Sequence, residues 1–272
     1  MCNRIQMEGP VYNTRDLGGI RTADGSMIKS RCLLRSGMLG RCTNGDIRTL
    51  TVKYNLRTVI DLRTEAEKQE MPDPDIEGVR FIHNPVLSNA MLGITREGQS
   101  KAGSMTEMIM DFMKTAGENP EEKLGLIYPL MVSDEFCLKQ IRNFFNILLE
   151  QVEGAVLWHC TAGKDRVGTT TALLLTALGA EREAIISDYL MTNTCLQPET
   201  EAMVTAVSRK IQDEKVLQAV RILNSASRSY IEAVFSEMEK QCASAERFLE
   251  EKLGLTEEKV KLLRRKYLEK YL

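Results

Sequence analysis

The stretch that decides the fold reads Ala155-Val-Leu-Trp-His-Cys-Thr-Ala-Gly-Lys-Asp-Arg166, and an apolar segment that ends at Gly179 follows it. Residues 155–158 are apolar and predict a short buried strand. A tight loop around Gly163 comes next, and residues 166–178 predict a helix that Gly179 closes. A strand, a loop and a helix in this order direct backbone N–H groups toward one point, so the stretch predicts an anion site.

Cys160 begins this loop, and Arg166 lies in the first turn of the predicted helix. A helix N-terminus and nearby cations lower the pKa of a thiol from about 8.5 to about 3.5–7.5, which makes it a nucleophilic thiolate. The planar guanidinium of Arg166 matches two oxygens of a phosphate, and Lys164 adds a second cation. His159 is placed to hydrogen-bond around the cysteine and hold its orientation. We therefore interpret Cys160 as a nucleophile rather than as a buried structural cysteine.

Short strands and helices alternate upstream of this stretch, which favours an α/β sheet. Residues 57–63 and 79–83 predict strands because β-branched and apolar residues fill their centres, and residues 32–35 predict a third. Residues 46–53 predict a helix. Residues 135–149 repeat apolar side chains at the i, i+3, i+4 spacing of an amphipathic helix.

Several polar residues near the predicted strand ends are candidates for supporting roles. Asp61 and Arg63 end a predicted strand, where ligands of α/β sheets gather, although a buried ion pair explains them equally well. Asp16 is expected to hold a turn. Arg35 and Ser36 are expected to support either the loop or a wall of the site.

The rest of the chain divides into two parts. In residues 86–134 the apolar periodicity is weak. This stretch predicts either a helical insertion or lid, with helices near 105–113 and 124–132, or an ordinary pair of surface helices. Residues 181–271 predict helices only. No linker or repeat interrupts the sequence, so we predict one domain over residues 1–272.

The composition excludes several classes of protein. Lys and Arg number 36 and Asp and Glu 38, a net charge of −2, which gives no broad attraction to nucleic acids or membranes. No apolar run approaches the roughly 18–20 residues of a membrane span, and the first residues lack the apolar core of a signal peptide. A cytoplasmic location is the default expectation, with signal-less export left open. The seven cysteines are widely spaced without a CxxC pair, so we expect neither a zinc site nor a disulfide framework. No cofactor is expected. The oligomeric state is not predicted.

The string from His159 to Arg166 resembles the signature loop of the cysteine-dependent phosphatases. Its HCxxGKDR form is similar to an atypical bacterial subgroup of tyrosine and dual-specificity phosphatases that also accept phosphoinositides. Other segments resemble further motifs of this subgroup: Asn13-Thr-Arg-Asp-Leu-Gly-Gly19, Leu34-Arg-Ser-Gly37, Val59-Ile-Asp-Leu-Arg63, Asp188-Tyr-Leu-Met-Thr-Asn193 and Gly254-Leu-Thr-Glu-Glu258.

The resemblance implies an α/β fold with a mostly parallel central sheet flanked by helices and a helical C-terminal part. It also implies two-step hydrolysis of a phosphomonoester without a metal. Cys160 attacks phosphorus, and water then releases phosphate. The phosphate would be held by the residues of the loop, which are Thr161, Ala162, Gly163, Lys164, Asp165 and Arg166.

The leaving oxygen of the substrate needs a proton from a general acid. The resemblance implies Asp165, since the subgroup carries an aspartate inside the loop, and the alternatives are Asp61 and Asp16. Asp165 can instead serve only to hold the loop by accepting backbone N–H bonds. Lys164 either contacts a second phosphate, as an inositol lipid would offer, or balances the charge of Asp165.

One residue departs from the superfamily pattern. Val167 stands where a serine or threonine usually supplies a hydroxyl that helps the cysteine sulfur leave in the second step. We expect phosphoenzyme breakdown to be slowed by about tenfold, the value of one hydrogen bond, unless the Thr169 hydroxyl compensates.

The expected substrate is phosphotyrosine in a protein or peptide, with phosphoserine, phosphothreonine and phosphoinositides left open. Because Val167 permits little turnover, a phosphate-binding module is the alternative function. A sulfur-transfer enzyme fits less well, because sulfur transfer does not call for Lys164 and Asp165. An arsenate-reducing enzyme usually needs a resolving cysteine close by in space, and Cys32 and Cys195 stay open as such partners.

Overall fold

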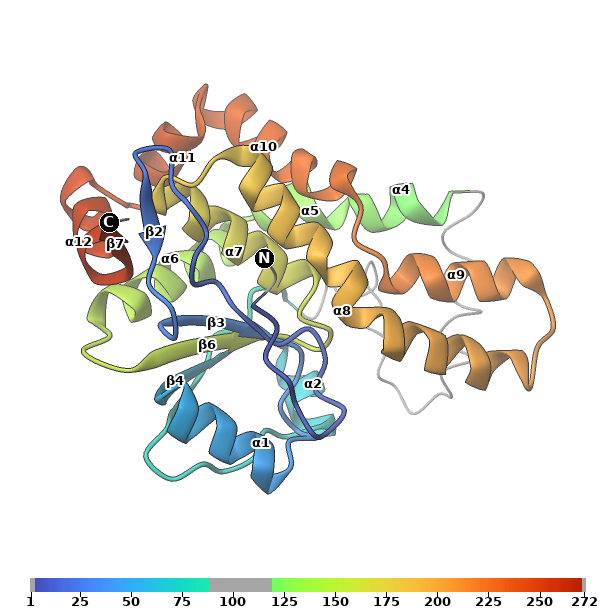
Figure 1. Ribbon diagram of the computed structural model, residues 1–272. Coiled ribbons are helices and arrows are strands. Elements are labelled where there is room, and N and C mark those ends of the chain that lie inside the picture. The colour runs from blue at the N-terminus through green and yellow to red at the C-terminus, as the bar shows by residue number, and fades with distance from the viewer. Residues whose placement is uncertain (1–2, 89–118, 271–272) are drawn as a thin grey trace.

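The computed structural model describes residues 3–88 and 119–270, and its centre is a sheet of five strands in the order β1-β3-β6-β4-β5 (Figure 1). Four neighbouring strands, β3, β6, β4 and β5, run parallel, and β1 pairs antiparallel with β3. The strands are β1 (Arg15–Asp16), β3 (Leu33–Ser36), β6 (Ala155–His159), β4 (Leu56–Asp61) and β5 (Arg80–His83). The predicted mostly parallel central sheet is therefore confirmed.

The sheet separates two hydrophobic cores. Successive side chains of a strand point to opposite faces, so Leu33 and Trp158 join the larger core while Leu34 and Leu157 join the smaller one. Helices α6 (Glu135–Glu150) and α7 (Asp165–Leu178) cover the larger core, and α1 (Asn44–Arg48) with the π-helix η1 (Thr49–Lys53) lies on the other face (Figure 1). Gly179 ends α7 with a left-handed φ of 84°, as its sequence position predicts.

The C-terminal part is helical. α8 and α9 lie side by side; α9 and the C-terminal half of α8 project from the body of the molecule, while the N-terminal half of α8 packs on α7 (Figure 1). The helices are α8 (Arg182–Ser208), α9 (Glu214–Asn224), α10 (Arg228–Cys242), α11 (Ala245–Glu251) and α12 (Glu257–Tyr267).

The expectation of helices alone over residues 181–271 is wrong at its end. Leu268–Lys270 forms strand β7, which pairs antiparallel with β2 (Ser26–Ile28) in a second, two-stranded sheet. The pairing partner lies near the other end of the chain, so no local pattern announces this strand.

The stretch over residues 86–134 is described only in part, and the helix predicted over 105–113 lies outside the described residues. The helix predicted over 124–132 is two short helices, α4 (Pro120–Gly125) and α5 (Ile127–Met131), that meet at Leu126. The side chains of Tyr128 and its neighbours in α5 are buried in the larger core. This part of the stretch therefore belongs to the main body.

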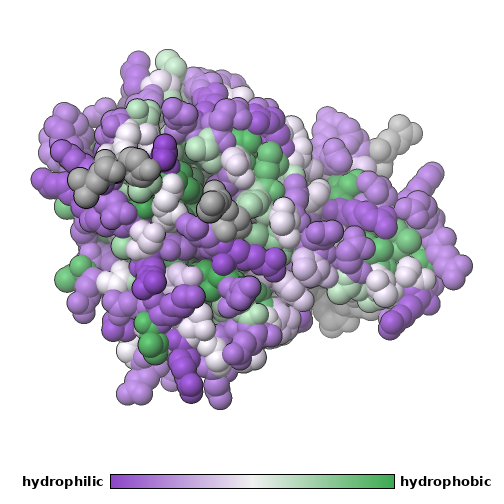
Figure 2. All heavy atoms as spheres, viewed as in Figure 1, coloured by the Kyte–Doolittle hydropathy of each residue, from purple (hydrophilic) through white to green (hydrophobic). Residues whose placement is uncertain are grey.

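The face seen in Figure 2 is mostly hydrophilic, and its hydrophobic atoms lie in small separate groups. Within residues 3–88 and 119–270, no helix combines the length and apolar character that crossing a bilayer requires.

Candidate active site

The predicted strand–loop–helix is present, with β6 ending at His159 and α7 beginning at Asp165. The register of the parallel strands brings Ser36, Asp61 and His159 to the same edge of the sheet. Cys160 follows directly, and its side chain is buried. Gly163 has φ +66°, and a Cβ there would lie 2.5 Å from the carbonyl oxygen of Ser36, so only glycine fits this turn.

The loop is held through its own carbonyl groups by residues of the N-terminal motifs. Asn13 Nδ2 donates to the carbonyl oxygens of Ala162 and Gly163 at 3.1 and 2.7 Å. Arg35 Nη2 donates to the same Gly163 oxygen at 2.9 Å. Arg35 therefore supports the loop, one of the two roles that its sequence position allows.

Asn13 and Arg35 thus form a clamp on the loop, and Asp188 of α8 anchors this clamp. Its Oδ1 accepts from Arg15 Nε at 2.9 Å, and its Oδ2 accepts from Arg35 Nη1 at 2.6 Å. Burial alone would raise the pKa of Asp188, but the two guanidinium groups hold it below its usual value. Burial and the charge of Arg15 lower the pKa of Arg35 to about 10, which still leaves it charged at neutral pH.

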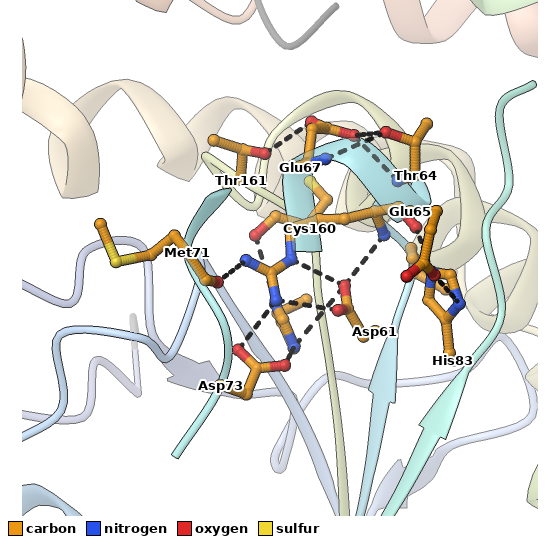
Figure 3. Close-up of polar contacts among 12 residues, drawn as sticks. Asp61, Thr64, Glu65, Glu67, Met71, Asp73, His83, Cys160 and Thr161 are labelled. Atoms are coloured by element: carbon orange, nitrogen blue, oxygen red, sulfur yellow. Dashed lines mark hydrogen bonds and ion pairs between the residues drawn. The ribbon is translucent and has the colours of Figure 1, made fainter. Parts of the chain in front are cut away.

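Arg166 is fixed by Glu67 of α2 (Glu65–Glu70). Its Nη1 and Nη2 donate to the two carboxylate oxygens at 2.7 and 2.8 Å, and both side chains are buried. The hydroxyl of Thr161 donates to Glu67 Oε1 at 2.8 Å. Burial would raise the pKa of Glu67, but Arg166 and further hydrogen bonds, from Thr64 and Thr161, lower it instead. In Figure 3, Cys160 is seen between Glu67 on one side and two aspartates, Asp61 and Asp73, on the other.

The sequence reasoning missed Glu67, although a signal was present. Thr64 and Glu67 form a capping box at the start of α2, directly after β4. Such a box locates a helix start at the carboxyl edge of the sheet, and it turns the Glu67 carboxylate inward.

The two supporting residues at the end of β4 join His159 in one network. Arg63 donates to both oxygens of Asp61, through Nε at 2.9 Å and Nη2 at 2.8 Å, and lies 3.1 Å from Asp73 Oδ1. His159 Nε2 hydrogen-bonds Asp73 Oδ2 at 3.0 Å, and its Nδ1 lies 3.3 Å from the Cys160 carbonyl oxygen. The network fixes the imidazole of His159 next to the backbone of Cys160. The sequence reasoning did not single out Asp73.

The same network offers the donor atoms of a cation site, because Asp61, Asp73 and His159 place ligand atoms within 4.8 Å of one another. The guanidinium of Arg63 already pairs with both carboxylates. A metal would therefore have to displace Arg63, so these residues fit an ion pair better than a metal.

Asp165 and Lys164 point into the helical body. Tyr128 donates a hydrogen bond to Asp165 Oδ1, and Lys164 Nζ lies 3.4 Å from the same oxygen. The ammonium also donates to the carbonyl oxygens of Leu223 and Ser225, at 2.8 and 3.2 Å. Lys164 is 2% exposed, so it balances Asp165 and ties the loop to the end of α9.

The remaining candidates lie apart from the loop or lack a polar partner. Asp16 accepts from the backbone N–H groups of Gly18 and Arg31 at 2.9 and 2.7 Å, so it holds a turn as expected. Val167 is fully buried. The hydroxyl of Thr169 is buried as well and makes no hydrogen bond within the part of the chain that the structure describes.

The fold and the site together define an α/β protein that presents a cysteine and a fixed arginine at the two ends of one short loop. Residues 5–269 match the model of a tyrosine phosphatase family. The chain belongs to this tyrosine phosphatase family and is a phosphatase enzyme.

Individual relatives of this chain also bear the names of phosphatases. The triple specificity protein phosphatase PtpB of Mycobacterium tuberculosis is 32% identical over 254 residues, which cover 89% of this chain and 88% of that protein. A protein of Cupriavidus necator that bears a tyrosine-protein phosphatase name is 28% identical over 247 residues, 89% of this chain and 82% of that protein. A tyrosine-protein phosphatase of Nostoc commune is 30% identical over 165 residues, 61% of this chain and 49% of that protein.

Proposed function

We propose that this enzyme hydrolyses phosphomonoesters through a cysteinyl-phosphate intermediate and that phosphotyrosine in proteins is its main substrate. One observation carries the proposal. Cys160 and Arg166 lie at the ends of a loop that Asn13, Arg35 and Glu67 hold in a single shape. A preorganised site of this kind stabilises the charge that develops on a transferring phosphoryl group.

In the first step, the Cys160 thiolate attacks phosphorus, the S–P bond forms and the bond to the leaving oxygen breaks. The leaving oxygen takes a proton from a carboxylic acid. In the second step, water attacks the same phosphorus, the S–P bond breaks, and the carboxylate takes a proton from the water. Inorganic phosphate leaves, and the thiolate is regenerated.

We assign the acid to Asp165, and the alternatives fit less well. His159 and Arg63 hold the pKa of Asp61 at about 2 against the effect of its burial, so Asp61 is ionised at neutral pH and has no proton to give. Both carboxylate oxygens of Asp16 accept hydrogen bonds from backbone N–H groups. Asp165 stands inside the loop itself.

Phosphoserine and phosphothreonine fit the same chemistry, and the name of the Mycobacterium tuberculosis relative denotes more than one specificity. Phosphoinositides fit less well, because the ammonium of Lys164 is occupied by carbonyl oxygens and by Asp165. We also propose that residues 1–272 form one domain, since one core joins side chains from β3, α6 and α10.

The test is hydrolysis of an aryl phosphate in the presence of a chelator, by wild type and by Cys160→Ser. Chelator-resistant turnover that vanishes in Cys160→Ser supports the proposal. Cys137→Ser is the matched control, because burial raises the pKa of Cys137 to about 12 and keeps it an inert thiol. Full activity of Cys160→Ser would contradict the mechanism.

A second function, phosphate binding with little turnover, is favoured by one observation, the apolar Val167 side chain at the start of α7. Wild-type protein that binds vanadate yet releases no phosphate from the aryl ester would establish it.

A further inference from the structure

Three buried tyrosines surround the inner side of Asp165. Tyr128 from α5 stacks on Tyr230 from α10, with ring centroids 5.1 Å apart, and meets Tyr189 from α8 edge-on at 6.1 Å. The Tyr128 hydroxyl donates to Asp165 Oδ1, and the hydroxyl oxygens of Tyr128 and Tyr189 are 2.5 Å apart. The hydroxyl of Tyr230 is buried and has no hydrogen-bond partner among the described residues.

The direction of these hydrogen bonds follows from the number of protons. A phenol has one proton to donate, and a carboxylate oxygen can only accept. Tyr128 therefore gives its proton to Asp165 and accepts the proton of Tyr189. Burial and the nearby charge of Asp165 raise the pKa of Tyr128 well above its usual value, so this donor stays protonated.

The two oxygens of Asp165 are consequently not equivalent. Oδ1 faces both the Tyr128 hydroxyl and the Lys164 ammonium, whereas Oδ2 makes no hydrogen bond with residues 3–88 or 119–270. A proton on this carboxyl group is therefore carried by Oδ2, while Oδ1 remains an acceptor.

We propose that Tyr128 is a positioning residue for the general acid: it holds Asp165 through Oδ1, so that Oδ2 carries the proton that reaches the leaving oxygen. The inference rests on the proposed function and extends it by a residue that touches neither substrate nor nucleophile. When Oδ2–H gives its proton away, the resulting carboxylate is stabilised by the hydrogen bond from Tyr128. In the second step the same carboxylate recovers a proton from water.

The test exploits the leaving group. An activated leaving group such as 2,4-dinitrophenol departs without a proton, whereas phenol needs one. We expect Tyr128→Phe, which keeps the ring and its stacking on Tyr230, to lower kcat/KM for phenyl phosphate about tenfold. For dinitrophenyl phosphate the change should stay below about twofold.

Tyr230→Phe is the matched control, since it removes a hydroxyl from the same cluster that bonds to nothing in the described chain. It should leave both substrates unaffected. Should Tyr128→Phe fail to fold, Tyr189→Phe carries the test. It removes the donor to Tyr128 and should produce a smaller loss, about two- to threefold, again only for phenyl phosphate.

Equal losses on both substrates, or no loss on either, would overturn the role of Tyr128 while leaving the phosphatase mechanism intact. Turnover that persists in Cys160→Ser would instead overturn the proposed function and this inference with it. The two failures are thus distinguished by different variants.

Discussion

Replacing Glu67 by glutamine removes one charge from a buried pair and leaves the shape of the side chain unchanged. Glu67 and Arg166 are 6% and 0% exposed and share two hydrogen bonds of 2.7 and 2.8 Å. Glutamine offers one acceptor and turns an N–H₂ donor toward the second guanidinium nitrogen. Removing one partner of a buried ion pair costs about 3–5 kcal/mol, and we expect a loss of stability of this size at pH 7.

The loss should appear in both folding and catalysis. At roughly 2–4 °C per kcal/mol, Tm should fall by about 6–20 °C. An Arg166 guanidinium that no longer keeps its orientation should stabilise the transition state less by about 2–3 kcal/mol, which is roughly a 30- to 150-fold drop in kcat/KM. Differential scanning calorimetry and initial rates on an aryl phosphate measure the two effects.

The pH dependence gives an independent check. The pKa of Glu67 is lowered from 4.5 in the folded state by Arg166 despite burial, so its contribution is present above pH 4.5. That contribution is lost as the pH falls through the lowered folded value. The gap in Tm between wild type and Glu67→Gln should therefore be largest near pH 7 and shrink below pH 4.5.

A matched control comes from the same helix. Glu65 is exposed and lies 3.5 Å from His83 Nδ1, so Glu65→Gln should change stability by less than about 0.5 kcal/mol. Two results would contradict this role of Glu67. The first is a Glu67→Gln variant with the Tm of wild type at pH 7 and a kcat/KM within twofold of it; the second is a gap in Tm that persists unchanged at acid pH.

Three further predictions concern other contacts of the loop. Val167→Thr supplies a hydroxyl where a buried valine stands. Any burst of product should disappear, and the steady-state rate should rise about tenfold. An unchanged burst would contradict the slow phosphoenzyme breakdown assigned to Val167. Lys164→Met removes a buried ammonium bonded to backbone oxygens, so the rates on phosphopeptides and inositol lipids should fall by similar factors; a loss confined to inositol lipids would show that Lys164 binds a second phosphate. Asp188→Asn leaves Arg15 and Arg35 close together without a counter-charge, and urea titration should show a loss of about 3–5 kcal/mol; a loss below about 1 kcal/mol contradicts this assignment.

The parts of the fold that the sequence predicts are those with strong local signals. β-branched and apolar runs mark β4 and β6, and the glycine that closes α7 stands at its left-handed φ. The helix expected over residues 46–53 is present as α1 followed by the π-helix η1, and it begins at Asn44 because Thr43 and Asp46 form a capping box there.

The parts that the sequence does not predict depend on partners far along the chain. Glu67 and Arg166 are 99 residues apart, and Tyr128 and Asp165 are 37 apart. Tyr128 lies in a stretch with weak periodicity, and only the packing of α5 against the core reveals its side chain as part of the site. Lys164 is ambiguous in sequence because a cation in a phosphate loop fits either a substrate or a structural contact.

The clamp around the loop has a consequence for the order of events in folding. Asn13 reaches Gly163 across 150 residues, and Arg15 reaches Asp188 across 173. Contacts of such sequence separation form late, because the entropy of closing long loops is lost before the contacts are gained. A chain still being synthesised, or only partly refolded, therefore carries the Cys160 thiol without the long-range contacts that hold its loop in shape. Recovery of catalytic activity should report the last cooperative step of refolding rather than the first collapse.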